Sequence, residues 1–106
     1  MPSKGEVVAS LVCIAMPPET RIEGLDDQQR IALHAGEIFK VGLLPRCQVR
    51  VRSPGIPISQ ASLIIITIEN DGRCRVHAVN HNFDVRLNDQ LLETHRVLEH
   101  GDVIEP

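Results

Sequence analysis

The sequence has almost no aromatic residues: Trp and Tyr are absent, and Phe occurs only as Phe39 and Phe83. Single-stranded nucleic-acid sites and grooves for proline-rich peptides depend on aromatic rings, so neither kind of site is expected. Cysteine is also scarce. There are three cysteines, an odd number, and none of them lies in a Cys-x-x-Cys pair; they are Cys13, Cys47 and Cys74. We therefore expect no disulfide framework and a reducing, intracellular environment.

An excess of positive charge is missing as well. Eleven Lys and Arg residues stand against 14 Asp and Glu residues, giving a net charge of -3. This balance argues against direct, general binding of nucleic acid. No apolar run approaches the ~20 residues of a membrane span, and the N-terminus is not a secretory signal. Glycine-rich phosphate-binding motifs are absent too, so we expect neither a membrane partner nor a nucleotide or other small-molecule substrate.

The chain is long enough for one domain. It has 106 residues, of which 42% are hydrophobic and 24% charged, the composition of a globular protein rather than a disordered one. We expect residues 1–106 to form a single domain. Because Pro106 follows directly after a predicted strand, we also expect the chain to be the N-terminal part of a longer protein.

Short β-branched segments separated by turn residues predict strands rather than helices. The predicted strands cover residues 6–15, 30–34, 38–42, 47–52, 63–68, 74–79, 85–87, 97–98 and 103–104. Nine or ten short strands with frequent turns are typical of an all-β fold, and specifically of an antiparallel β-sandwich.

Several local expectations accompany this strand pattern. Residues 19–29 are polar and predict a loop, and residues 26–35 offer a helix as an alternative, although their alternation suits a strand better. Ala35-Gly36 predicts a hairpin turn between the strands on either side. Residues 63–68 predict a strand buried on both faces, with a buried helix as the alternative, and Asn70-Asp71-Gly72 predicts a tight hairpin after it. Asn88-Asp89 predicts a further turn.

No assembled catalytic or metal-binding set is recognisable. The five histidines are scattered, and no Cys or carboxylate completes a tetrahedral metal site with them; they are His34, His77, His81, His95 and His100. His81 and His95 could meet across strands. Cys47 and His34 could form a nucleophile–base pair, but Cys47 opens an alternating strand where a small buried residue fits well. We expect no enzyme activity, no cofactor and no metal.

Five arginines call for separate treatment: Arg46, Arg50, Arg52, Arg73 and Arg75. Arg50 and Arg52 share the polar face of one predicted strand. One interpretation is a solvated sheet face whose charges discourage edge pairing. The other is a site for an anion or a phosphate group.

The order of motifs resembles a forkhead-associated (FHA) domain. The blocks that carry this resemblance are Val41-Gly42, Pro45-Arg46-Cys47-Gln48-Val49, Pro57-Ile58-Ser59, Leu87-Asn88 and Leu98-Glu99-His100-Gly101-Asp102-Val103-Ile104. They cover most of the chain, from about Ala32 to Ile104. The resemblance implies an all-β fold, an antiparallel β-sandwich of about ten or eleven short strands, that binds phosphothreonine peptides through loops at one end.

The phosphopeptide site implied by this resemblance is degenerate. Leu43 stands where the family has the phosphate-gripping Arg, and Gln60 follows the retained Ser59 where a basic residue is usual. Phe83 and Asp84 replace an Asn and a Gly in the third loop.

Two further positions are structural in the family. Ser62 replaces the loop-supporting His, and Asn88 keeps a mainly structural Asn. A phosphate dianion needs charge-assisted donors, so we expect ordinary phosphothreonine binding to be lost. Arg46 is the nearby substitute cation.

Within the family, the loops are most similar to the N-terminal domain of the mediator of DNA damage checkpoint proteins. That likeness implies a homodimerising scaffold module of a DNA-damage-response adaptor. It also implies a nuclear, chromosome-associated location with a role at breaks or telomeres, and chromatin or repair proteins as partners of the full-length protein.

The residues offer two alternatives for function. The expected dimer or partner surface is an apolar patch at loop tips, made of Leu43, Leu44, Ile56, Ile58 and Phe83. These side chains could equally tuck into their loops. The alternative function is a phosphopeptide reader with a rebuilt site that uses Arg46, Ser59 and Arg52.

Overall fold

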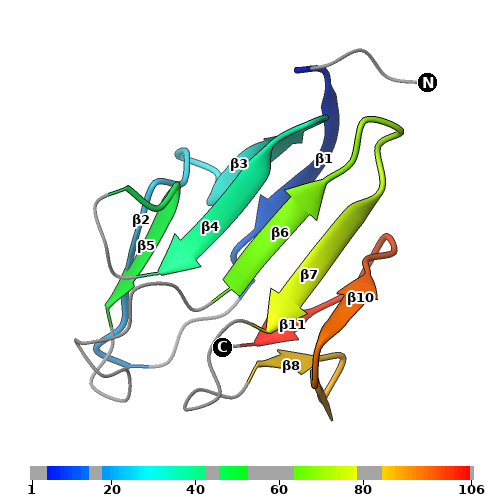
Figure 1. Ribbon diagram of the computed structural model, residues 1–106. Coiled ribbons are helices and arrows are strands. Elements are labelled where there is room, and N and C mark those ends of the chain that lie inside the picture. The colour runs from blue at the N-terminus through cyan, green and yellow to red at the C-terminus, as the bar shows by residue number, and fades with distance from the viewer. Residues whose placement is uncertain (1–4, 15–17, 43–45, 53–63, 79–84, 106) are drawn as a thin grey trace.

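The computed structural model describes residues 5–14, 18–42, 46–52, 64–78 and 85–105, which form strands and turns with no helix (Figure 1). The strands in these residues are β1 (Val7–Val12), β2 (Arg21–Glu23), β3 (Arg30–His34), β4 (Ile38–Gly42), β5 (Val49–Arg52), β6 (Ile64–Ile68), β7 (Cys74–Ala78), β8 (Arg86–Leu87), β9 (Gln90–Leu91), β10 (His95–Val97) and β11 (Ile104–Glu105). The predicted all-β class is confirmed, and the helix considered for residues 26–35 is replaced by a turn and β3.

The strands form three sheets, of two, six and three strands. Their orders are β1-β3, β10-β7-β6-β4-β5-β2 and β11-β8-β9. All pairs are antiparallel except β4 with β5, where Val41 lies opposite Val49. The expectation of purely antiparallel pairing is therefore wrong at this pair.

The side chain of Gln48 forms hydrogen bonds with the part of β4 that β5 does not pair with. Its amide accepts a hydrogen bond from the Lys40 N–H at 2.9 Å and donates one to the Ile38 carbonyl at 3.1 Å. An unpaired backbone group away from water is costly. Gln48 thus does for β4 what a neighbouring strand would do, just before β5 begins.

The predicted hairpin between β3 and β4 is also wrong, because the turn between them changes sheets. On one side, the Ala35 N–H donates to the Glu6 carbonyl beside β1. On the other, the Gly36 N–H donates to the Ile68 carbonyl, and the Ile68 N–H donates to the Glu37 carbonyl. β3 consequently pairs with β1, whereas β4 pairs with β6.

Two predicted tight turns are confirmed. After β6, the Gly72 N–H donates to the Glu69 carbonyl at 3.0 Å, and β7 returns antiparallel to β6. After β8, Asn88 and Asp89 both have positive φ, 53° and 67°, as a two-residue type I′ hairpin requires. The short β9 that follows was not expected from the sequence.

The polar segment at residues 19–29 is not entirely a loop, because it contains β2. This strand pairs antiparallel with β5, with Ile22 opposite Val51. Gly24 follows at φ 103°, where a Cβ would lie 2.1 Å from the Gln48 carbonyl oxygen. Only glycine permits this close approach. Asp26 then holds the turn into β3 by accepting hydrogen bonds from the N–H groups of Gln28 and Arg30.

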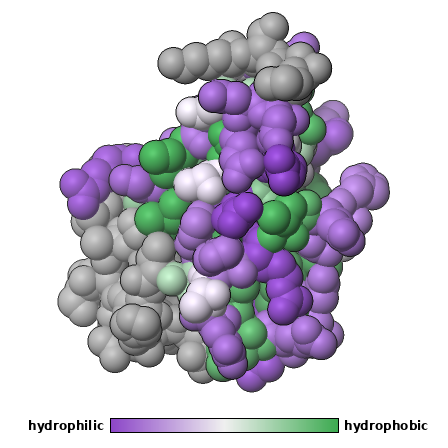
Figure 2. All heavy atoms as spheres, turned by 45° about the vertical axis from the view of Figure 1, so that its right-hand side comes forward, coloured by the Kyte–Doolittle hydropathy of each residue, from purple (hydrophilic) through white to green (hydrophobic). Residues whose placement is uncertain are grey.

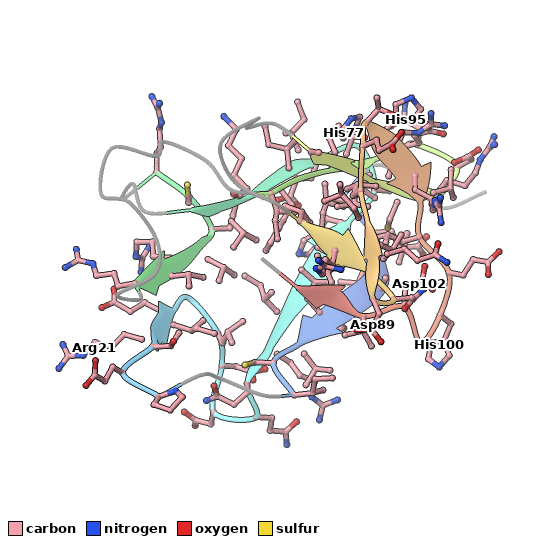
Figure 3. The ribbon with its side chains drawn as sticks, turned by 90° about the horizontal axis from the view of Figure 1, so that it is seen from below. Arg21, His77, Asp89, His95, His100 and Asp102 are labelled. Atoms are coloured by element: carbon pink, nitrogen blue, oxygen red, sulfur yellow. The ribbon has the colours of Figure 1, made fainter. Side chains whose placement is uncertain are left out.

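The inner faces of all three sheets share one core. Its most buried side chains come from β3, β4, β6, β7 and the segment at β8; they are Phe39, Leu33, Ile66, Val76 and Val85. Figure 3 shows β6 and β7 of the six-stranded sheet on one side of the molecule, with β1, β8 and β11 below them in the view. β6 is not buried on both faces as predicted, since Ile65 and Thr67 on its second face are only half-buried.

Candidate interaction surface

The outer face of the six-stranded sheet, turned away from the core, carries ordered rows of side chains. Strand register defines two rows across β4, β6, β7 and β10, which we call the outer-face rows: Lys40, Ile65, His77 and His95 in the first, and Ile38, Thr67, Arg75 and Val97 in the second. Directly opposed residues on one face lie about 4.5–5.5 Å apart at Cβ, so each row is continuous. The rows mix aliphatic, imidazole and cationic groups.

A histidine pair lies at the β10 end of the first row. The ring centroids of His77 and His95 are 5.8 Å apart, with the planes tilted by 43° (Figure 3). The Nε2 of His77 shares a hydrogen bond with the Thr67 hydroxyl at 3.0 Å, and Arg75 donates to Nδ1 of His95 at 3.4 Å. Desolvation, followed by the charges of His95 and Arg75, lowers the pKa of His77. His77 is therefore neutral near pH 7.

The ion pairs that involve described residues of this face lie at its margins. Glu69, directly after β6, pairs with Arg75 at 3.5 Å and with Arg73 at 3.7 Å. Glu23 on β2 pairs with Arg50 on β5 at 3.2 Å. These exposed or half-exposed pairs contribute little to stability, because water screens them. They do, however, neutralise both acidic groups.

Other cations on the face have no carboxylate partner within the described ranges. By register, Arg21, Lys40 and Arg52 lie on the same face as Arg50, and none of the three has an ion pair in the part of the chain that the structure describes. Arg21 lies at the opposite end of the molecule from His77 and His95 (Figure 3). The positive charge therefore extends along the sheet rather than gathering at one point.

An open depression of about 580 Å³ lies over the outer-face rows. It is lined by the whole first row, by Ile38 and Thr67 of the second row, and by Ala78, Glu93 and Thr94. The side chain of Ile38, at the edge of the depression, is 57% exposed. Figure 2, which turns the β7 and β10 side forward, shows separate apolar patches among hydrophilic side chains. A shallow surface with an aliphatic floor and a charged rim is suited to contact with a protein segment.

A second polar cluster joins two turns beside the three-stranded sheet. The Asn88 side chain donates to the Asp102 carboxylate at 2.9 Å and accepts from the Val103 N–H at 2.8 Å. The other oxygen of Asp102 accepts from the Glu99 N–H at 2.7 Å. The Glu99 N–H and the Asn88 amide together lower the pKa of Asp102. The cluster fixes the β8–β9 turn against the turn that precedes β11.

The structure describes only part of the site predicted from the sequence. Arg46 is exposed, and Arg52 ends β5 on the outer face. The remaining members of the predicted phosphopeptide site and apolar patch lie outside the described residues: Leu43, Leu44, Ile56, Ile58, Ser59, Gln60, Ser62, Phe83 and Asp84. His81 lies outside them as well, so its suggested meeting with His95 is untested.

The sequence did not single out the pairing of His77 with His95. Both residues stand on alternating segments, but the register that brings them together depends on long-range strand pairing. Cys47 and His34, which the sequence suggested as a pair, have separate surroundings. Cys47 is buried, and Nδ1 of His34 contacts the Gly5 carbonyl at 2.9 Å. Burial raises the pKa of the Cys74 thiol.

Three further features of the described residues bear on function. Cys13, Cys47 and Cys74 form no disulfide. Within the described ranges, no three side chains of His, Cys, Asp and Glu gather as metal ligands. None of the described segments is a helix long and apolar enough to span a membrane. Comparisons with protein-family models, with curated proteins and with solved structures found no match.

Proposed function

We propose that this chain is a non-catalytic protein–protein interaction module whose three sheets assemble as an FHA-type β-sandwich. A shared core between the sheets supports this assembly. The open, aliphatic depression with its charged rim supports docking of a protein rather than turnover of a small molecule.

The Asn88–Asp102 cluster is the observation that carries the proposal. Asn88 belongs to the fourth motif block of the FHA resemblance and Asp102 to the fifth, 14 residues further along the chain. Their side chains are hydrogen-bonded, and Val103 of the fifth block donates to Asn88. A physical link of this kind gives both blocks a structural reason to occur together in one fold.

The proposed role is that of a self-associating scaffold that has lost ordinary phosphothreonine recognition. The sequence at Leu43, Phe83 and Asp84 supports the loss, because these residues give a phosphate dianion no cationic donor. The resemblance to mediator of DNA damage checkpoint proteins, including the mutator-2 type, extends the proposal to a nuclear, chromosome-associated adaptor. In such an adaptor, a second contact made through the linked copy is effectively intramolecular, so dimerisation would raise its effective concentration.

Light scattering after size exclusion tests self-association directly. Across a tenfold range of concentration, the wild-type chain should show a mass near twice 11.8 kDa. The double substitution Leu43→Asp/Phe83→Asp should give the monomer mass, because charge on an apolar contact prevents its burial. Leu91→Asp is the matched control at an exposed apolar side chain on β9. A wild-type monomer overturns self-association, and an unchanged dimer in the double variant overturns this patch.

A phosphopeptide titration tests the alternative site. Measurable binding of phosphothreonine peptides that is lost in Arg46→Ala but kept in Arg86→Ala would replace the proposed loss by a rebuilt reader. Arg46 is exposed and available for such a contact, whereas Arg86 lies on β8 in the three-stranded sheet. Absence of binding at high micromolar peptide supports the proposal as stated.

A further inference from the structure

We propose that the outer face of the six-stranded sheet binds an acidic protein segment that carries an aliphatic side chain. This inference concerns other residues than the apolar patch above and does not depend on self-association. It rests on the charge, the apolar floor and the continuity of the outer-face rows.

The charge on this face opposes the charge of the whole chain. Among the described strand residues that register places on the face, the basic side chains are Arg21, Lys40, Arg50, Arg52 and Arg75. Glu23 is the acidic one, with Glu69 and Glu93 at the margins. The chain as a whole has a net charge of -3. A basic face on an acidic protein attracts anionic partners and orients them toward that face.

The acidic residues on this face are largely occupied, while several cations are not. Glu23 and Glu69 are held by Arg50, Arg73 and Arg75. Within the described ranges, Lys40 and Arg52 have no ion pair. Carboxylates of a docked segment would therefore meet uncompensated positive charge at Lys40, which lines the depression, and again further along the same face at Arg52 on β5.

The aliphatic floor favours a peptide over a nucleic acid. Ile38 and Ile65 line the depression next to Lys40, and Ile38 is 57% exposed. A Leu, Ile or Val side chain of a partner would remove this surface from water. A phosphate backbone gains nothing from aliphatic groups, and the described part of this face offers no Phe, Tyr or Trp on which bases could stack.

An amide NMR titration tests the proposal, because it detects binding at the affinity expected of a shallow surface. The probe is a twelve-residue peptide with two central Leu residues between blocks of Asp and Glu. Its controls are a peptide with Lys in place of every acidic residue and one with Ser in place of both Leu residues. We expect shifts concentrated on β4, β6, β7 and β10, at least about tenfold weaker binding in 0.5 M salt, and weaker binding of the Ser peptide.

Matched variants separate this face from the rest of the molecule. Lys40→Glu/Arg52→Glu should weaken binding of the acidic peptide at least about tenfold. Arg86→Glu on β8 should leave it unchanged, because β8 belongs to a different sheet. Ile38→Ser should abolish the preference for the Leu peptide over the Ser peptide. Circular dichroism and urea midpoints check that each variant is folded.

Four outcomes overturn the proposal. They are the absence of shifts at millimolar acidic peptide, equal binding of the Lys peptide, shifts on β8, β9 and β11 instead, or tighter binding of duplex DNA that the same variants abolish. The last result would make the face a nucleic-acid surface. A monomer that binds the acidic peptide supports this inference while self-association fails, so the two proposals can be told apart.

Discussion

At the scale of single residues, Asn88 shows how one side chain can serve two purposes. Its backbone occupies the left-handed region at φ 53°, which asparagine tolerates better than most residues. Its amide bridges the Asp102 carboxylate and the Val103 N–H. The turn therefore depends on asparagine both for its conformation and for its hydrogen bonds, and substitutions can separate these contributions.

We expect Asn88→Gly to destabilise the protein by about 1–2 kcal/mol, because it removes two hydrogen bonds while permitting the positive φ. Asn88→Ala should cost roughly 1 kcal/mol more, because alanine also resists the left-handed conformation. Urea unfolding of both variants and the wild type measures the difference. Equal stability of the Gly and Ala variants would contradict the conformational part, and a neutral Gly variant would contradict the hydrogen-bond part.

His77 links local burial to pH dependence. Desolvation, His95 and Arg75 lower its pKa below the ordinary 6.5, so the unfolded chain binds more protons than the native protein just below pH 6.5. The stability that His77 contributes is present above pH 6.5 and is lost as the pH falls through its lowered pKa.

We therefore expect wild-type stability to fall between pH 7 and pH 5 more steeply than that of His77→Gln, since glutamine does not titrate. Urea midpoints at several pH values measure the slope. His100→Gln, at an exposed turn far from the histidine pair in Figure 3, is the control and should keep the wild-type slope. A His77→Gln slope equal to that of the wild type would contradict the assignment.

At the scale of elements, backbone contacts outside regular hairpins determine how the strands are arranged. The turn after β3 changes sheets through bonds to Glu6 on one side and Ile68 on the other. Gln48 closes the edge of β4 with its side chain, and Gly24 brings the end of β2 against the Gln48 carbonyl. These three positions place β2, β4 and β5 in one sheet and so build the basic end of the outer face.

Gly24 provides the sharpest element-level prediction. A Cβ at this position would lie 2.1 Å from the Gln48 carbonyl oxygen, so Gly24→Ala should cost about 3 kcal/mol or more and detach β2 from β5. Gly101→Ala is the control. Its φ is also positive, at 88°, but nothing lies within 4 Å of the added Cβ, so only the conformational cost of about 1–2 kcal/mol is expected. Urea unfolding compares them, and amide exchange in β2 reports detachment; equal costs would contradict the close approach.

At the scale of the whole molecule, the two proposed surfaces come from different parts of the chain. The apolar patch expected from the sequence consists of residues outside the described ranges, whereas the outer-face rows belong to described strands. A scaffold that dimerises through one surface and binds an acidic partner through the other gains avidity, because the linked copy makes a second contact. The light-scattering and NMR experiments address these surfaces separately.

Much of the strand pattern could be predicted because its causes are local. Alternation in β5, β-branched residues in β6 and the turn residues after β6 and β8 all act over a few neighbours. β2 was missed because its polar sequence forms a strand only through pairing with β5. The predicted β3–β4 hairpin failed for a related reason: a turn signal says that the chain bends, but not which sheet it enters next.

The candidate surface was less predictable than the fold. The basic, alternating character of β5 was visible in Arg50 and Arg52, and an anion site was among the interpretations. The contact between His77 and His95 was not visible, because 18 positions separate the two residues and nothing local specifies their register. The same holds for Lys40 and Ile65, which are neighbours only across paired strands.

The sequence by itself determined the all-β class, most strand positions and the sites of the tight turns, because backbone preference and side-chain alternation are properties of adjacent residues. Only the tertiary structure decided the parallel pairing of β4 with β5, the change of sheet after β3 and the rows on the outer face. These depend on which strands share hydrogen bonds and on which face of each strand the common core buries. That choice belongs to the packing of the whole chain rather than to any one segment.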